Sequence, residues 1–121
     1  MAKKILIVDD ETDFVELLKY RLATNKFDVT VAENGVIALE KARKERPDLI
    51  LLDIKMPIED GVSTYEQLKE HDETKDIPVI FITAFPNIAV KERVLKMGAR
   101  DYITKPYDDD DLLEKVRKAF S

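Results

Sequence analysis

The sequence contains no cysteine, a single histidine and only three glycines among its 121 residues. Without cysteine, the chain forms neither a disulfide nor a thiolate zinc site. The histidine, His71, lies in a charged stretch and has no second histidine with which to share a metal, so we interpret it as a surface residue. The glycines Gly35, Gly61 and Gly98 are isolated, and this excludes the glycine-rich loops of P-loop and dinucleotide-binding proteins.

Long hydrophobic runs and an excess of positive charge are also missing. The first apolar run covers only Ile5 to Val8, which is far too short for a signal peptide or a membrane-spanning helix, and no other run is better suited. The formal net charge is -5, whereas a nucleic-acid-binding domain normally carries a basic face. We therefore expect a soluble cytoplasmic protein that binds neither a membrane nor nucleic acid directly.

The length fits one ordinary domain, and the hydrophobic content of 45% is enough for a single core. We find no internal repeat, no low-complexity segment and no linker rich in proline, glycine or serine. The expected organisation is therefore one domain covering residues 1–121.

Five short apolar runs alternate with longer amphipathic segments. Because the runs are short and rich in β-branched residues, they predict strands. Strands joined by helices are parallel, and their sheet is covered by helices on both faces. The second and fifth runs are shorter and contain threonine or tyrosine, which suits edge strands. The fold class is therefore α/β, a flavodoxin-like doubly wound (βα)5 chain with sheet order 2-1-3-4-5. The runs are Ile5–Val8, Val29–Val31, Leu49–Leu52, Val79–Ile82 and Tyr102–Thr104.

Helical spacing follows the first two runs. Asn34 is a candidate N-cap for the second helix. The pair Asn34-Gly35 could also begin a hairpin, but the residues that follow have helical and not alternating spacing. In the first segment, residues 13–24, the apolar residues expected along one helical face are Phe14, Leu17, Leu18, Tyr20 and Leu22.

Three more helices are expected in the second half of the chain. Ser63 and Glu66 have the spacing of a capping box, and the helix that they begin is expected to end at residues 71–72. The fourth helix is predicted over residues 87–97, with Gly98 as its C-terminal cap. The last is predicted over residues 108–120, and its aspartates lie at the first turn, where the helix dipole favours negative charge.

Polar residues stand at the ends of four predicted strands. In doubly wound sheets, ligands bind beyond the carboxyl ends of the strands, where the strand order reverses. The first strand ends in Asp9-Asp10 and the third in Asp53, whereas Thr83 and Lys105 follow the fourth and fifth. Each residue alone has an ordinary explanation, such as a helix cap or a solvated charge. Their placement at successive strand ends favours a common site.

The residue types at this edge point to phosphoryl chemistry. Three neighbouring carboxylates repel one another and call for a divalent cation, and ligation by oxygen alone suits Mg²⁺. A carboxylate nucleophile approaches a phosphoryl group only when their negative charges are neutralised, which the metal and Lys105 would do. Thr83 offers a hydroxyl donor for a phosphoryl oxygen.

The ordered set of motifs resembles the signature of bacterial response-regulator receiver domains. The resemblance spans nearly the whole chain, and no single motif carries it. The residues that carry it are Asp9-Asp10, Asp53, Met56-Pro57, Gly61, Thr83-Ala84 and the stretch 98–106, which contains Lys105-Pro106.

The resemblance implies a two-component phosphorelay receiver and not an enzyme in the ordinary sense. Asp53 would accept the phosphoryl group from the phosphohistidine of a histidine kinase or a histidine phosphotransfer domain, and would lose it by slow autodephosphorylation. By the same resemblance, Asp10 and Asp53 bind Mg²⁺ directly, Asp9 acts through water, and Lys55 gives its backbone carbonyl.

The resemblance also implies how a signal leaves the site. Thr83 and Lys105 would bind phosphoryl oxygens, and Lys105 would pair with Asp53 before phosphorylation. Thr83 and Tyr102 would act as the switch, with Tyr102 moving from an exposed to a buried position. We expect phosphorylation to shift the surface formed by the fourth helix, the fifth strand and the fifth helix, residues 85–113, and so to alter partner binding. Lys105-Pro106 is expected to be a cis peptide, and Lys55 and Phe85 are expected to flank the entrance for water.

Two other functions fit the sequence less well. A haloacid-dehalogenase-like phosphatase needs a nucleophile at the end of the first strand with a second acid two residues on, whereas here the pattern is Asp9-Asp10-Glu11. A degenerate receiver that acts only as an interaction module is disfavoured because every polar position is filled. Because the sequence runs only just past the last helix, we expect either a single-domain regulator or part of a longer one, with an unknown downstream protein or a missing output domain.

Overall fold

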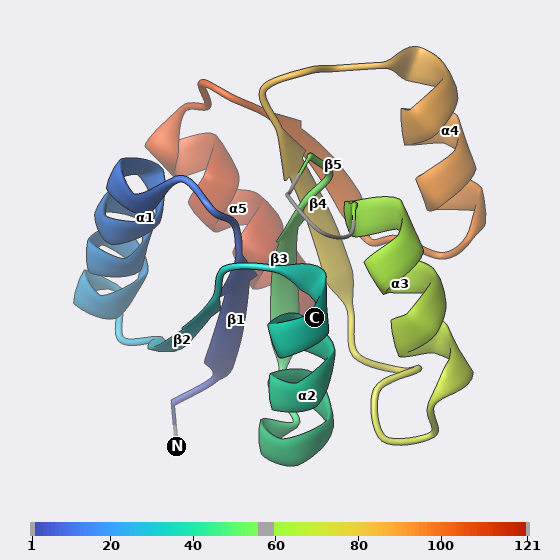
Figure 1. The fold of residues 1–121 in the computed structure, drawn as a ribbon. Coiled ribbons are helices and arrows are strands. Elements are labelled where there is room, and N and C mark those ends of the chain that lie inside the picture. The colour runs from blue at the N-terminus through green and yellow to red at the C-terminus, as the bar shows by residue number, and fades with distance from the viewer. Residues whose placement is uncertain (1, 56–59, 121) are drawn as a thin grey trace.

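The computed structural model describes residues 2–55 and 60–120, which form one parallel sheet with helices on both faces (Figure 1). The strand order is β2-β1-β3-β4-β5, and every neighbouring pair is parallel. This confirms the predicted fold class and strand order. The strands are β1 (Lys4–Val8), β2 (Asp28–Ala32), β3 (Leu49–Asp53), β4 (Val79–Thr83) and β5 (Asp101–Thr104).

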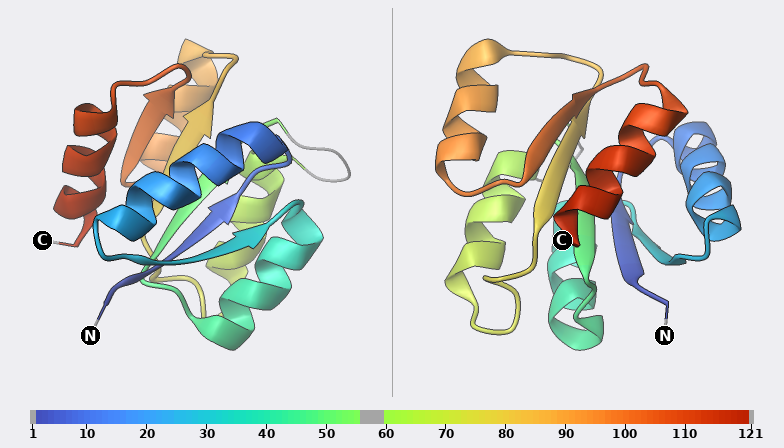
Figure 2. Two further views of the ribbon diagram at one scale, coloured as in Figure 1. Left: turned by 90° about the vertical axis from the view of Figure 1, so that its left-hand side faces the viewer. Right: turned by 180° about the vertical axis from the view of Figure 1, so that it is seen from behind.

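Helices α1 and α5 cover one face of the sheet, and α2, α3 and α4 cover the other (Figures 1 and 2). Two hydrophobic cores result, one on each face. None of the helices within residues 2–55 and 60–120 is long and apolar enough to cross a membrane. The helices are α1 (Thr12–Thr24), α2 (Gly35–Glu45), α3 (Gly61–Glu70), α4 (Ile88–Lys96) and α5 (Asp109–Ala119).

Alternation along the strands divides their side chains between the two cores. On β1, Leu6 and Val8 belong to the core under α2, α3 and α4, whereas Ile5 and Ile7 belong to the core under α1 and α5. A central strand therefore has no face for a polar residue, which explains the uninterrupted apolar runs of β1, β3 and β4. The site residues begin where these runs end.

The buried face of α1 differs from the predicted one. Val15, Leu18 and Leu22 are buried, whereas Leu17 and Tyr20 are 65% and 68% exposed. The buried residues follow the three- and four-residue spacing that places side chains above one another on a helix. Leu17 and Tyr20 lie beside this stripe, so the prediction that they face the core was wrong.

The other four helices begin at residues whose side chains accept a hydrogen bond from a first-turn amide. Asn34 accepts from Ile37, which confirms its predicted cap and excludes the hairpin. Asp60 caps α3 by accepting from the Ser63 N–H at 2.8 Å. The predicted capping box at Ser63 and Glu66 was therefore wrong, because α3 already begins at Gly61 and Ser63 lies within its first turn. Asn87 and Asp108 cap α4 and α5 in the same way.

Among the strands within residues 2–55 and 60–120, β2 is at one edge of the sheet and pairs with β1 alone. The Ala32 carbonyl accepts from the Asp9 N–H at 3.1 Å and so points toward β1. Because carbonyls alternate along a strand, that of Val31 points toward the free edge. There it accepts a hydrogen bond from the ammonium of Lys41 on α2.

Candidate functional site

The carboxyl ends of the strands bring the predicted site residues to one edge of the sheet. Asp53 is the last residue of β3 and Thr83 the last of β4, whereas Asp9 follows β1 and Lys105 follows β5. Asp9, Asp10 and Asp53 each offer a carboxylate oxygen, and these oxygens lie within 4.8 Å of one another. The expected convergence of polar residues is therefore present.

Two of the three carboxylates are buried. Asp9 is 3% exposed and Asp53 is 5% exposed, whereas Asp10 is exposed. A buried carboxylate is costly unless its oxygens find partners. One Asp9 oxygen, Oδ1, accepts from the Glu11 N–H at 2.9 Å, and Oδ2 accepts from the Lys105 ammonium at 2.7 Å. Asp9 is thus satisfied by groups of this chain.

The Lys105 ammonium makes several contacts at once. It donates to Asp9 at 2.7 Å and to Glu11 at 2.9 Å, and it lies 3.9 Å from the centre of the Phe14 ring. The expected ion pair with Asp53 is present, but its distance of 3.9 Å is the longest of the three ion pairs and is too long for a hydrogen bond. Burial alone would lower the pKa of Lys105, but the carboxylate partners outweigh this effect and raise it.

Asp53 has an unusual proton affinity. Burial raises its pKa from 3.8 to about 7, and the negative charge of Asp9 adds to the effect. Lys105 and the N–H of Lys55, which donates to Asp53 Oδ1 at 3.4 Å, act in the opposite direction but do not cancel it. The groups around Asp53 therefore supply less positive charge than its ionised form requires.

The same imbalance provides a test of whether the residues fit a magnesium ion. The three carboxylates offer only oxygen ligands, they lie close together, and the raised pKa of Asp53 shows that positive charge is lacking. A hard divalent cation that prefers oxygen supplies that charge. Asp9, Asp10 and Asp53 therefore fit Mg²⁺, whereas the role predicted for the Lys55 carbonyl stays a prediction.

Gly61 allows α3 to start directly against the end of β3. Its N–H donates to the Ile54 carbonyl at 2.7 Å. A Cβ atom at this position would lie 2.2 Å from the Asp53 carbonyl oxygen and 2.8 Å from the Ile54 Cα, closer than atoms can approach. The backbone at Asp53 thus depends on this glycine. Met56-Pro57, which also contribute to the sequence resemblance, lie outside the described residues.

Thr83 is fully buried, and its hydroxyl oxygen accepts from the Phe85 N–H at 3.0 Å. Tyr102 is already buried, at 7% exposure, and its hydroxyl accepts from the Asn87 N–H at 3.4 Å. The exposed starting position expected for Tyr102 is therefore not the one in this structure. Tyr102 does not pack on α5 either, because alternation along β5 places it in the core under α4.

Lys55 and Phe85, which the sequence predicts at the entrance for water, lie close to each other, and their role at that entrance stays a prediction. Both are exposed, and the Lys55 ammonium lies 5.2 Å from the centre of the Phe85 ring. Lys105-Pro106 is a cis peptide, also as predicted.

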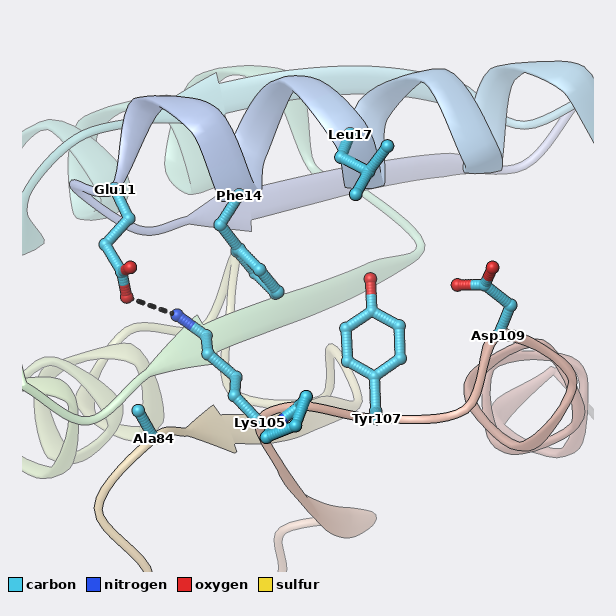
Figure 3. A pocket seen from close by; sticks show the side chains of 8 residues that line it. Glu11, Phe14, Leu17, Ala84, Lys105, Tyr107 and Asp109 are labelled. Atoms are coloured by element: carbon cyan, nitrogen blue, oxygen red, sulfur yellow. Dashed lines mark hydrogen bonds and ion pairs between the residues drawn. The ribbon is translucent and has the colours of Figure 1, made fainter.

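A cavity of about 360 Å³ opens beside Lys105, between the start of α1 and the segment that joins β5 to α5 (Figure 3). The sequence did not predict Glu11 and Phe14 as neighbours of Lys105. A usable signal was the position of Glu11, which directly follows Asp9-Asp10 and precedes α1, where glutamate is not a favoured cap. The lining residues are Glu11, Phe14, Leu17, Ala84, Lys105, Pro106, Tyr107 and Asp109.

Comparison with known proteins gives consistent results. A family model described as the response regulator receiver domain matches residues 5–117. The alkaline phosphatase synthesis transcriptional regulatory protein PhoP of Bacillus subtilis is 40% identical over 117 residues, which cover 97% of this chain and 48% of PhoP. The response regulator PleD of Caulobacter vibrioides is also 40% identical over 117 residues, covering 97% of this chain and 26% of PleD. The chain thus spans half or less of the length of these relatives.

Solved structures agree with the observed fold. The receiver domain of the sensor histidine kinase PA1611 from Pseudomonas aeruginosa superposes with a TM-score of 0.89 at 27% identity, and the match covers 100% of both chains. That crystal structure has a magnesium ion coordinated in its active-site cleft.

Proposed function

The chain belongs to the family of response-regulator receiver domains of two-component systems, whose standard function is to accept a phosphoryl group on an aspartate, and we propose that Asp53 is that aspartate here. The position of Asp53 carries the proposal. It is a buried carboxylate at the end of a central strand, with carboxylate oxygens of Asp9 and Asp10 within 4.8 Å and the Lys105 ammonium at 3.9 Å. The family model matches residues 5–117, and we propose that the receiver domain covers residues 1–121.

In the proposed reaction, a carboxylate oxygen of Asp53 attacks the phosphorus of a phosphohistidine. The P–N bond breaks as the O–P bond forms, and the released imidazole nitrogen takes a proton from solvent. Lys105 and the hydroxyl of Thr83 stabilise the negative charge of the phosphoryl oxygens. The Lys55 N–H, which already reaches toward Asp53 Oδ1, orients the nucleophile.

We place Mg²⁺ at the acidic cluster, with Asp10 and Asp53 as direct ligands, Asp9 acting through water and Lys55 contributing its carbonyl. When bound, the ion neutralises charge on the carboxylates and on the incoming phosphoryl group. The close approach of the three carboxylates and the raised pKa of Asp53 support this arrangement.

The phosphoryl donor is proposed to be a histidine kinase or a histidine phosphotransfer domain. PhoP and PleD extend well beyond the matched region, and PhoP is a transcriptional regulatory protein. By analogy, phosphorylation of this receiver would control an output domain, in the same chain or in a separate protein.

The route from Asp53 to that output is proposed to run through Thr83 and Tyr102 to the surface formed by α4, β5 and α5. Tyr102 is buried and its hydroxyl already contacts the backbone of Asn87 just before α4. Phosphorylation would therefore stabilise an arrangement that exists beforehand. Amide chemical shifts with and without beryllofluoride test this route. Changes confined to the neighbourhood of Asp53, with residues 85–113 unaffected, would contradict it.

Loss of the phosphoryl group is proposed to be slow hydrolysis within the domain. Lys55 and Phe85, whose ammonium and ring centre lie 5.2 Å apart, would flank the path of an attacking water. No turnover of an external substrate is implied.

The assignment of Asp53 is tested by phosphorylation with acetyl phosphate or phosphoramidate in the presence of Mg²⁺. Intact mass should show one added phosphoryl group on the unmodified protein and none on Asp53→Asn. The control is Asp76→Asn, which removes an exposed carboxylate from the loop before β4, at the opposite end of the sheet. If Asp53→Asn incorporates phosphate as the control does, the assignment fails.

A further inference from the structure

The ammonium of Lys105 is held on the side of the site that faces α1 by Asp9 and by two groups that the proposed reaction does not use, Glu11 and Phe14. We propose that Glu11, together with the ring of Phe14, is a positioning residue that restrains Lys105 before phosphorylation. The inference deepens the proposed function and rests on it, because restraining Lys105 matters only if its ammonium later binds a phosphoryl group at Asp53.

The distances define the restraint. Two of the three ammonium protons are engaged by Asp9 at 2.7 Å and Glu11 at 2.9 Å, and the ammonium lies 3.9 Å from the centre of the Phe14 ring. Asp53, at 3.9 Å, is beyond hydrogen-bond reach. Figure 3 shows the Lys105 side chain extending toward Glu11, with the Phe14 ring beside its end. The Lys105 ammonium is therefore held beside the start of α1 and the residues that precede it.

Glu11 is available for this contact because it does not cap its helix. It occupies the N-cap position of α1, but its side chain makes no capping hydrogen bond, in contrast to the cap residues of α2 to α5. Its backbone is held by Asp9 Oδ1, which accepts the Glu11 N–H at 2.9 Å. The buried carboxylate of Asp9 thus accepts hydrogen bonds from both the Glu11 backbone and the Lys105 ammonium.

The two partners differ in their access to solvent. The side chain of Lys105 is 8% exposed, whereas that of Glu11 is 59% exposed. A phosphoryl group on Asp53 would compete with Glu11 for the same ammonium. Because water screens the charge of an exposed partner, breaking the ion pair between Glu11 and Lys105 costs little free energy. The ion pair should therefore weaken the binding of a phosphoryl group or its analogue at Asp53 by about two- to fivefold. Glu11 therefore adjusts how readily the phosphorylated state forms and does not block it.

The alternative is an incidental surface ion pair. It differs in its consequences, because an incidental pair would not affect the binding of a phosphoryl analogue at Asp53. The test variant is Glu11→Gln, which keeps the size of the side chain and removes its charge. The matched control is Glu16→Gln, which removes the same charge from an exposed position on α1, near Asp9 and Asp10.

Two quantities are measured on the protein of residues 1–121 with Mg²⁺. The first is the apparent affinity for beryllofluoride, a phosphoryl analogue, and the second is the ¹⁵N signal of the Lys105 ammonium without beryllofluoride. Glu11→Gln should bind beryllofluoride about two- to fivefold more tightly and should shift the Lys105 signal. Glu16→Gln should do neither. Phe14→Leu, which keeps an apolar side chain, should also shift the Lys105 signal.

The inference is overturned if Glu11→Gln behaves like Glu16→Gln in either measurement. A shifted Lys105 signal with unchanged affinity would mean that the contact exists but restrains nothing. The failure of the proposed function looks different, because the unmodified protein itself would then bind no beryllofluoride and would take up no phosphoryl group on Asp53. In that case the role in phosphorylation is lost, although the Lys105 signal still reports whether Glu11 holds the ammonium.

Discussion

At the scale of single residues, Asp53 is most strongly defined by its surroundings. Its carboxylate is buried beside Asp9, and both effects raise its pKa to about 7. The folded protein therefore binds a proton at Asp53 more readily than the unfolded chain, in which the pKa is 3.8. The contribution of Asp53 to stability is greatest below pH 4 and is lost as the pH rises through 7.

This reasoning predicts how stability depends on pH without Mg²⁺. Between pH 5 and pH 8 the free energy of unfolding should fall, relative to that of Asp53→Asn, by at most about 2.5 kcal/mol. Comparing the two proteins cancels the other carboxylates, which titrate in both. Urea unfolding at the two pH values measures the difference. A constant difference across this range would mean that Asp53 titrates at an ordinary pH.

Gly61 is the second residue that its environment defines. No side chain fits at this position, because a Cβ atom would lie 2.2 Å from the Asp53 carbonyl oxygen. Gly61→Ala should displace the backbone at Asp53, lower the free energy of unfolding by about 2 kcal/mol, and reduce phosphorylation by acetyl phosphate.

Gly98→Ala is the control for Gly61→Ala. Gly98 has a positive φ of 108°, so alanine there is strained, but its Cβ would meet only ordinary contacts at 3.5 Å, away from Asp53. This variant should lose stability while phosphorylating normally. If both variants phosphorylate equally well, the contact between Gly61 and Asp53 does not shape the site.

The sequence predicted which residues gather at the site better than it predicted how their side chains point. The carboxyl ends of parallel strands lie at the same edge of the sheet, so the sequence alone predicted that Asp9, Asp53 and Lys105 lie close together. The hydrogen bond from Lys105 to Glu11 depends on side-chain rotamers, and spacing along the chain carries no information about them. The buried position of Tyr102 was missed for the same reason.

At the scale of elements, α4 and α5 differ in how firmly they are anchored. Val94 is the one buried residue of α4, whereas α5 buries Leu112, Leu113, Val116 and Ala119. Because burial of apolar side chains holds a helix to its sheet, α4 should open locally at a lower free energy than α5.

This difference predicts that amide hydrogen exchange is faster in α4 than in α5. Asn87→Ala removes the cap that accepts from the Val90 N–H and should accelerate exchange in α4 further. The control is Asn34→Ala, the same change at the cap of α2, which should lower stability by about 1 kcal/mol without a selective effect on α4. Equal exchange in α4 and α5 would contradict the prediction.

The elements themselves were predictable because strands buried on both faces are apolar throughout. Helix boundaries and faces were less so. The spacing of Ser63 and Glu66 matched a capping box. However, Gly61 has no Cβ atom to clash with the end of β3, so α3 begins earlier, with Asp60 as its N-cap. On α1, apolar residues occupy a wider part of the helix surface than the part that packs against the core. The residue type alone therefore did not show that Leu17 and Tyr20 are exposed.

At the scale of the whole molecule, the chain carries a net charge of -5, and three of its carboxylates offer oxygens that lie within 4.8 Å of one another at the site. Their mutual repulsion lowers the stability of the folded chain, and a cation that binds only the folded state should relieve it. For an assumed dissociation constant of ~1 mM, ~10 mM Mg²⁺ should add roughly 1.4 kcal/mol to the free energy of unfolding.

The prediction is checked by thermal melts with and without Mg²⁺. Asp10→Asn should be more stable than the unmodified protein without the ion and should lose the response to it. Asp76→Asn, far from the site, should respond normally. Melts run with NaCl at equal ionic strength separate site binding from screening of the net charge. An unmodified protein that is indifferent to Mg²⁺ would argue against the metal site.

The ammonium of Lys41 donates to the outward-facing carbonyl of Val31 at the free edge of β2. An unpaired edge strand can recruit a strand from another molecule, and a cation placed on the edge is a common defence against such pairing. Lys41 occupies one acceptor on β2 and places a positive charge on the strand's free side. We therefore expect Lys41 on α2 to hinder the pairing of β2 with a strand of another molecule.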